Sequence, residues 1–141
     1  MEQNIKTALM AKVATTLSSV GIGGNDERRG MPLQAGQTLH PIITSEDDIH
    51  TQTIPASRGQ VERTFLYVDT EEGVRLTPTQ ITRRGSGIKF NANTIAGAFT
   101  EWIERVADAK RYSLTVENMF SRPGNGGNMQ HSAVFSESIE N

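Results

Sequence analysis

Two stretches of the chain repeat apolar residues at the spacing of an amphipathic helix. In residues 4–19 the apolar side chains recur every three or four positions, and Gly21 follows as a terminator that can adopt the left-handed conformation. We predict a helix there, docked either on its own domain or on a partner subunit. In residues 95–109 the pattern is stronger, because Phe99 and Trp102 belong to one apolar stripe and charged residues occupy the opposite face. This second helix is expected to cover a sheet, with Trp102 as a core anchor.

Alternation of apolar and polar residues predicts strands in the middle of the chain. Residues 64–68 are β-branched and aromatic, which is typical of a central strand. Residues 69–73 supply turn formers and residues 74–76 resume the alternation. We therefore predict a β-hairpin that ends before Pro78, because proline has no backbone donor. Further strands are expected at residues 37–43, 49–54 and 112–120.

These elements predict an α+β fold. We expect an antiparallel sheet of about five strands, open or curled into a small barrel and covered by the 95–109 helix, with the N-terminal amphipathic helix on a glycine-rich arm. The expected division of the chain is an N-terminal helix at 1–20, a glycine-rich arm at 21–36, a single core domain at 37–120 and a flexible polar C-terminal tail at 121–141.

Composition narrows the class of protein. The chain has 141 residues, a formal net charge of -2 and no cysteine, so disulfides, thiolate metal sites and cysteine nucleophiles are excluded. Because the net charge is close to zero, any nucleic-acid contact would need a local basic patch. No apolar run reaches the roughly 20 residues of a membrane span, and none has the character of a signal peptide. We expect a protein that is cytoplasmic at synthesis and that enters a particle when it assembles.

The sequence contains no pattern typical of catalysis or metal binding. His40, His50 and His131 lie in unrelated segments, without the spacing that places two histidines on one helix face, so no metal site is predicted. Most acidic residues stand in turns, and Ser86 in RRGSGI lacks the flanking residues of a nucleophile elbow. We expect a non-enzymatic protein with no cofactor, no small-molecule substrate and no membrane partner.

One segment combines basic residues with a glycine-bearing loop, as anion-binding sites do. Residues 73–100 contain no acidic residue, and the glycine-bearing loop at 85–87 can form an anion-binding concavity beside basic side chains. Phe65 and Tyr67, two apart on one strand, either stack exposed bases or form the buried face of that strand. The candidate contacts to an anion, a nucleic acid or a partner protein are Arg75, Arg83, Arg84, Gly85, Ser86, Gly87, Lys89, Phe65 and Tyr67.

The predicted layout favours an assembly role over nucleic-acid binding. A compact domain with an N-terminal helix, a glycine-rich arm and a polar tail resembles, in layout and not in any motif, the small accessory subunits that tile viral shells and tails. Extended arms suit such subunits because they order on contact with neighbours and add interface without enlarging the core. We therefore expect a non-catalytic structural or assembly protein of a larger, viral particle that contacts protein partners or copies of itself. The alternative is a small β-barrel that binds single-stranded nucleic acid through the basic glycine-rich loop and the Phe65/Tyr67 strand.

Overall fold

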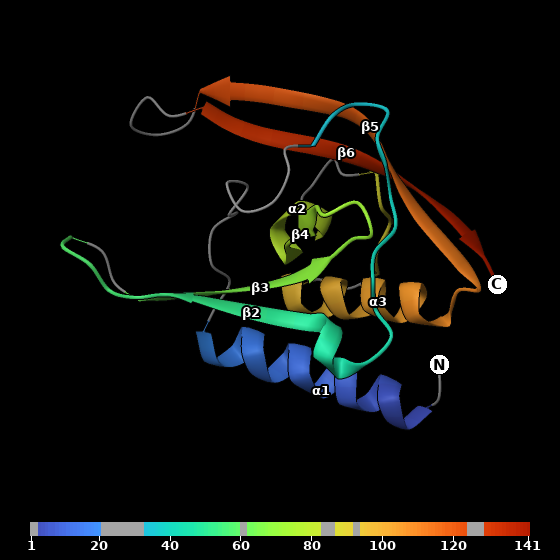
Figure 1. The fold of residues 1–141 in the computed structure, drawn as a ribbon, viewed down its shortest axis with the longest axis horizontal. Helices are drawn as coiled ribbons and strands as arrows, with labels where there is room; N and C mark the ends of the chain where they lie inside the picture. The colour runs from blue at the N-terminus through green and yellow to red at the C-terminus, as the bar shows by residue number, and fades with distance from the viewer. Residues whose placement is uncertain (1–2, 21–32, 60–61, 83–86, 92–93, 124–128) are drawn as a thin grey trace.

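The structure is a computed structural model that describes residues 3–20, 33–59, 62–82, 87–91, 94–123 and 129–141. Its architecture is α+β, as predicted, with antiparallel strands and a few helices (Figure 1). In chain order the elements are α1 (Gln3–Val20), β1 (Thr38–Leu39), the 3-10 helix η1 (Glu46–Asp48), β2 (Ile49–Ile54), β3 (Arg63–Asp69), β4 (Arg75–Leu76), α2 (Pro78–Thr82), α3 (Ile95–Asp108), β5 (Arg111–Pro123) and β6 (Met129–Glu140). Figure 1 shows β5 and β6 along one side of the molecule and α1 along the other, with β2, β3, β4 and α2 between them.

The strands form two small sheets, so the expected single sheet of about five strands is wrong. One sheet has the order β1-β5-β6 and the other β2-β3-β4, and the described residues form no closed barrel. A single buried cluster collects apolar side chains from both sheets and from the helices, among them Val68, Leu114 and Phe99. Because helix side chains complete this cluster, both sheets bury a face without their strands joining edge to edge.

The central hairpin forms where it was predicted. β2 pairs with β3 along its full length, and β3 pairs with β4 across a tight turn. In that turn Gly73 has a φ of 85°, and the hydroxyl oxygen of the buried Thr70 accepts the N–H of Val74 at 3.0 Å. β4 ends at Leu76, and Pro78 begins α2, because the fixed φ of proline suits the first position of a helix. The turn between β3 and β4 is therefore stabilised by hydrogen bonds between its own residues, Thr70 and Val74.

The 95–109 helix is confirmed as α3. Thr94 caps it by accepting the N–H of Gly97 on its hydroxyl oxygen at 3.0 Å. The apolar stripe of α3 is buried, and Trp102 has no exposed surface, so Trp102 is a core residue as predicted. The indole N–H of Trp102 donates to the hydroxyl of Tyr112 at 2.7 Å. This bond satisfies a polar atom that burial would otherwise leave unpaired.

The N-terminal helix docks on its own domain. α1 buries Leu9 and Val13 and packs against α3, β2 and β3. Its Lys6 ammonium lies 2.7 Å from a carboxylate oxygen of Asp108 and 3.1 Å from one of Glu104, both on α3. Among the described parts of the chain, no helix combines the length and the apolar character needed to cross a membrane.

The C-terminal segment differs most from the prediction. Residues 129–140, expected as part of a flexible polar tail, form β6 and pair with β5 along the whole of that strand. β6 places Phe135 in the core with 1% of its surface exposed. The strand forms because β5 supplies its hydrogen-bonding partner, a contribution that the polar local composition does not reveal.

Most of the glycine-rich arm, residues 21–32, lies outside the described residues. The end of the arm is joined to the first sheet, because the N–H of Gly36 donates to the carbonyl oxygen of Val116 at 2.7 Å. The short β1 then pairs with β5 at Leu114 and Thr115. The chain thus enters the core at the middle of β5.

Asp48 closes the cap of η1, and its carboxylate is a source of pH-dependent stability. It accepts the N–H and the hydroxyl of Thr44, both at 2.6 Å, and the N–H of Ser45 at 3.0 Å. Partial burial acts to raise the pKa of Asp48, but these hydrogen bonds outweigh it, so the pKa lies below its ordinary value. The carboxylate therefore stabilises the fold above about pH 4, and this contribution is lost as the pH falls through the lowered pKa.

We predict that Asp48→Ala lowers the free energy of unfolding by about 1 kcal/mol at neutral pH. The change should also make the decline of stability in acid shallower, because one acid-sensitive carboxylate has been removed. Urea unfolding across a pH series measures both effects. Asp47→Ala is the matched control, since Asp47 is an exposed neighbour with the same charge. Equal effects of the two substitutions would contradict the prediction.

Candidate functional site

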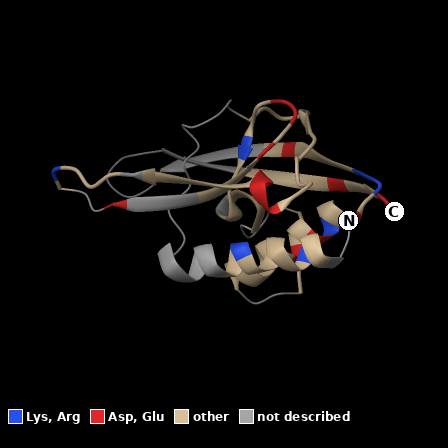
Figure 2. Ribbon diagram, turned by 60° about the horizontal axis from the view of Figure 1, so that its bottom comes forward, with Lys and Arg blue, Asp and Glu red and all other residues tan. Residues whose placement is uncertain are grey.

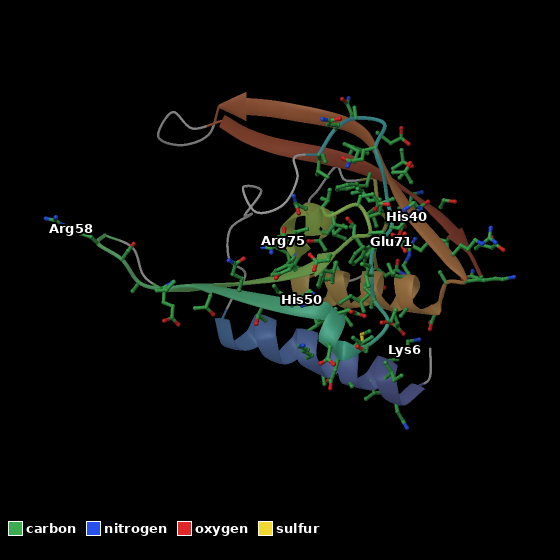
Figure 3. All side chains as sticks on the ribbon, viewed as in Figure 1. Lys6, His40, His50, Arg58, Glu71 and Arg75 are labelled. Carbon is green, nitrogen blue, oxygen red and sulfur yellow. The ribbon has the colours of Figure 1, made fainter. Side chains whose placement is uncertain are left out.

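Arg75, a basic candidate from the hairpin, is held by side chains of its own sheet (Figure 3). Its guanidinium carbon lies 4.5 Å from the centroid of the Tyr67 ring, and its Nη1 donates to Oε1 of Gln52 at 3.0 Å. Its Nε lies 3.9 Å from Oδ1 of Asp69. The ring of His50 packs on the same tyrosine, with centroids 5.3 Å apart. Arg75 is therefore part of a packed polar cluster on one face of the β2-β3-β4 sheet.

The structure shows which face of the predicted central strand is buried. Leu66 and Val68 are core residues, and Tyr67 is half-buried on the opposite face. The ring of Tyr67 already contacts a guanidinium and an imidazole, so a stacking base would have to displace one of them. Phe65 belongs to β3, but its side chain lies outside the described residues.

Much of the basic glycine-rich loop lies outside the described residues. This applies to Arg83, Arg84, Gly85 and Ser86. Gly87 is the first described residue after them, with a φ of 81°, and its backbone lies against the carbonyl of Phe135 in β6. The described end of the loop is therefore packed on the first sheet.

Lys89, the last basic candidate, lies in surroundings of mixed charge. It is exposed, and its carbonyl oxygen accepts a hydrogen bond from Arg105 at 2.8 Å. It lines an open groove of about 470 Å³ beside α3 that also contains Glu101, Glu104 and Asp108. Figure 2 shows basic and acidic residues interspersed over the described ribbon. Within the described residues, Lys89 and Arg75 thus do not belong to a common basic patch.

A chain of hydrogen bonds joins α3 to β5 and β6. The hydroxyl of Tyr112 accepts from Trp102 and donates to Oε2 of Glu137, and Arg105 donates to Oε1 of the same carboxylate. Burial, followed by the neighbouring Glu137 carboxylate, raises the pKa of the Tyr112 hydroxyl, so Tyr112 remains a neutral donor. Each polar side chain of this hydrogen-bond network has a partner within it, which gives the network a structural role.

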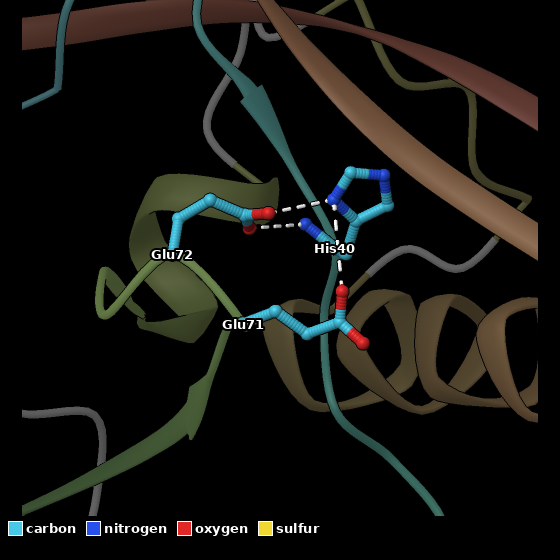
Figure 4. Close-up of side chains that lie close together, drawn as sticks. All are labelled: His40, Glu71 and Glu72. Atoms are coloured by element: carbon cyan, nitrogen blue, oxygen red, sulfur yellow. Dashed lines mark hydrogen bonds and ion pairs between the residues drawn. The ribbon is translucent and has the colours of Figure 1, made fainter.

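The structure also brings together three potential metal ligands, His40, Glu71 and Glu72, although no metal site was predicted from the sequence (Figure 4). Nδ1 of His40 lies 2.6 Å from Oε2 of Glu72 and 3.9 Å from Oε2 of Glu71. The backbone N–H of His40 donates to Oε1 of Glu72 at 2.7 Å. Partial burial acts to raise the pKa of Glu72, but the hydrogen bonds from the ring and backbone of His40 outweigh it and lower that pKa.

Sequence spacing missed this cluster because His40 and Glu72 are 32 residues apart. The only local signal is the pair of adjacent glutamates in a predicted hairpin turn, and such pairs are common on protein surfaces. The backbone pairing of residue 41 with residue 70 is what places the histidine beside the turn. The cluster is therefore a product of tertiary structure.

An open groove of about 580 Å³ begins beside this cluster. His40 and Glu71 form part of its lining, and Lys110, Arg111 and Tyr112 at the start of β5 form another part. The groove is large enough to admit a small polar ligand. Comparison of the chain with known protein families, with curated proteins and with solved structures finds no match.

Proposed function

We propose that this protein is a non-catalytic structural or assembly subunit that joins copies of itself into a larger particle through its β5–β6 hairpin. The observation that supports this most is the far half of the hairpin, beyond the bulge between Val116 and Asn118. There, within the described residues, β5 pairs with β6 alone, because β1 reaches only Leu114 and Thr115. Figure 1 shows the far end of the hairpin lying apart from α1, α2 and α3.

The outer edge of β6 supports pairing with another chain. β6 is an edge strand of its sheet, and an edge presents backbone N–H and C=O groups that a further strand can use. Natural sheets block such edges with lysines, other charges or proline. Residues 129–134, MQHSAV, contain none of these. Self-pairing of this stretch in two copies would satisfy both edges at once.

A second projecting element supports the same role. The described part of the connection between β2 and β3, residues 55–59, extends away from the helices, and Figure 3 shows Arg58 far from them. Residues 55–59 of this connection are all exposed. In Figure 1 it points toward the same end of the molecule as the far end of the β5–β6 hairpin. Arms of this kind add interface area without enlarging the core. That the particle is viral rests on the predicted layout of the chain alone.

The alternative function, binding of single-stranded nucleic acid, has less support from the described residues. Such binding needs open aromatic rings beside a continuous basic groove. Tyr67 and Arg75 instead contact each other, and Lys89 lies beside acidic residues. Two further basic candidates, Arg83 and Arg84, lie outside the described residues, so they support neither function.

The proposal predicts that the full chain self-associates through β6. Sedimentation of the wild-type protein over a concentration series should show a monomer in equilibrium with larger species. Ser132→Lys places a charge on this edge strand and should weaken association by about tenfold or more, because lysines on edge strands oppose pairing with a further strand. Circular dichroism should show unchanged secondary structure in the variant.

Ala11→Lys is the matched control, since it adds the same charge at an exposed position of α1. It should leave association unchanged. A wild-type chain that remains monomeric at every concentration would overturn the proposal, as would equal weakening by both lysines. Tight, salt-sensitive binding of a single-stranded oligonucleotide by that monomer would favour the alternative.

A further inference from the structure

We propose that His40, Glu71 and Glu72 bind a divalent transition-metal ion, with Zn²⁺ as the ion that fits the ligand set best. One imidazole nitrogen and two carboxylate oxygens lie within 4.8 Å of one another. Imidazole with carboxylate is a donor set that zinc accepts, with water in the remaining position. The assembly function proposed above does not depend on this site.

The backbone holds the three residues in place without help from an ion. The N–H of Glu71 donates to the carbonyl oxygen of His40 at 3.0 Å, and the N–H of Ile42 donates to the carbonyl oxygen of Asp69 at 2.9 Å. The turn that presents the two glutamates is closed by the buried Thr70, whose side chain and backbone both form hydrogen bonds with Val74, just before β4. A site on such a support loses little conformational freedom when it binds.

The distances require only small side-chain movements. Zinc bonds of about 2.0–2.2 Å place neighbouring ligand atoms of a tetrahedral site about 3.3 Å apart. The His40–Glu72 separation of 2.6 Å must lengthen by about 0.7 Å, and the His40–Glu71 separation of 3.9 Å must shorten by about 0.6 Å. Rotation of the glutamate side chains supplies both changes. The ion takes the place of the proton between Nδ1 and Oε2: a neutral imidazole frees Nδ1 by carrying its proton on Nε2, and an imidazolium releases one proton to solvent.

The local charge favours a dication. With a neutral imidazole the cluster has two negative charges, and among the described residues neither glutamate is paired with a lysine or arginine. The fourth coordination position can be reached from the groove beside His40 and Glu71. A nitrogen donor and only three protein ligands suit Zn²⁺ better than Ca²⁺, which takes six to eight oxygens.

Titration calorimetry of the tag-free full chain with Zn²⁺ tests the site. We expect a single Zn²⁺ per chain, and Zn²⁺ should also raise the midpoint of thermal unfolding, because it links the β1–β2 connection to the β3–β4 turn. Glu71→Gln should weaken the affinity about tenfold or more and remove the thermal shift. Glu71 is exposed, and its carboxylate lies as far as 3.9 Å from Nδ1 of His40. Because so weak a contact contributes little to stability, this variant should fold normally. His40→Ala should have the same effect on affinity.

His50→Ala is the matched control, since His50 also lies near a carboxylate, 3.4 Å from Asp69. It should leave the Zn²⁺ affinity and the Zn²⁺-induced rise of the unfolding midpoint unchanged. The proposal is overturned if the wild-type chain binds no Zn²⁺, or if Glu71→Gln and His40→Ala bind it as well as the wild type does. Binding of Ca²⁺ as tight as that of Zn²⁺ would also overturn it, because it would indicate nonspecific attraction to exposed acids.

Discussion

Replacing Trp102 with alanine should lower the free energy of unfolding by about 3–5 kcal/mol. The ring is fully buried, stacks on Phe99 with centroids 5.5 Å apart and meets Tyr112 edge-on at 6.3 Å. Alanine would leave a cavity among these rings and would also leave the Tyr112 hydroxyl without its donor. Urea unfolding followed by circular dichroism measures the loss, because the variant has no tryptophan fluorescence.

Ile95→Ala on the same helix is the matched control, since Ile95 is 37% exposed. It should cost less than about 1 kcal/mol. Trp102→Phe separates volume from hydrogen bonding, because it keeps an aromatic ring and removes the donor. A Trp102→Ala protein as stable as the Ile95→Ala protein would show that the ring is not part of the core, and so would wild-type tryptophan emission at the fully solvated wavelength.

Alanine at Gly87 should destabilise the fold by about 2–4 kcal/mol, through two costs that add. The φ of 81° lies in the left-handed region, which alanine rarely adopts. A Cβ atom at this position would also overlap the carbonyl oxygen of Phe135 and lie 3.3 Å from Cγ1 of Val134. Because the obstacle is strand backbone, either β6 or the 87–91 segment would have to move.

Gly36→Ala isolates the conformational cost, so its difference from Gly87→Ala gives the cost of the steric overlap. Gly36 has a nearly equal φ of 86°, but a Cβ atom there would meet no other atom within 4 Å. It should therefore show only the conformational cost of about 1–2 kcal/mol. Thermal and urea unfolding of both variants compare the two sites. Equal destabilisation would mean that the 87–91 segment does not pack on β6 as the structure shows.

The two proposals concern separate parts of the molecule. The self-association test changes Ser132 in the far half of β6, and the zinc test changes His40 and Glu71 beside the β3–β4 turn. Zinc binding by a monomeric chain would leave the metal site supported and the assembly role overturned. Self-association without zinc binding would do the reverse, so failure of one proposal does not obscure the other.

Local periodicity determined the elements that are stabilised by their own neighbours in sequence. The stripe containing Phe99 and Trp102 predicted α3 and its buried face, because a helix places residues three and four apart on one side. The hairpin around Gly73 was predictable for a similar reason, since turn residues and alternation act within a few positions. These features could be inferred from the sequence before any tertiary contact was known.

Only the tertiary structure decided which distant segments meet. Residues 129–140 look like a polar tail because a strand gains its hydrogen bonds and its buried face from its pairing partner, here β5, and not from its own composition. The division into two sheets follows from helix side chains joining the core, which no strand pattern reveals. The His40–Glu71–Glu72 cluster depends on the backbone pairing that brings residue 41 beside residue 70. The sequence alone therefore determined the local elements of this protein, whereas its candidate metal site and its division into two sheets arise from long-range contacts, whose energies depend on the whole fold and not on local spacing.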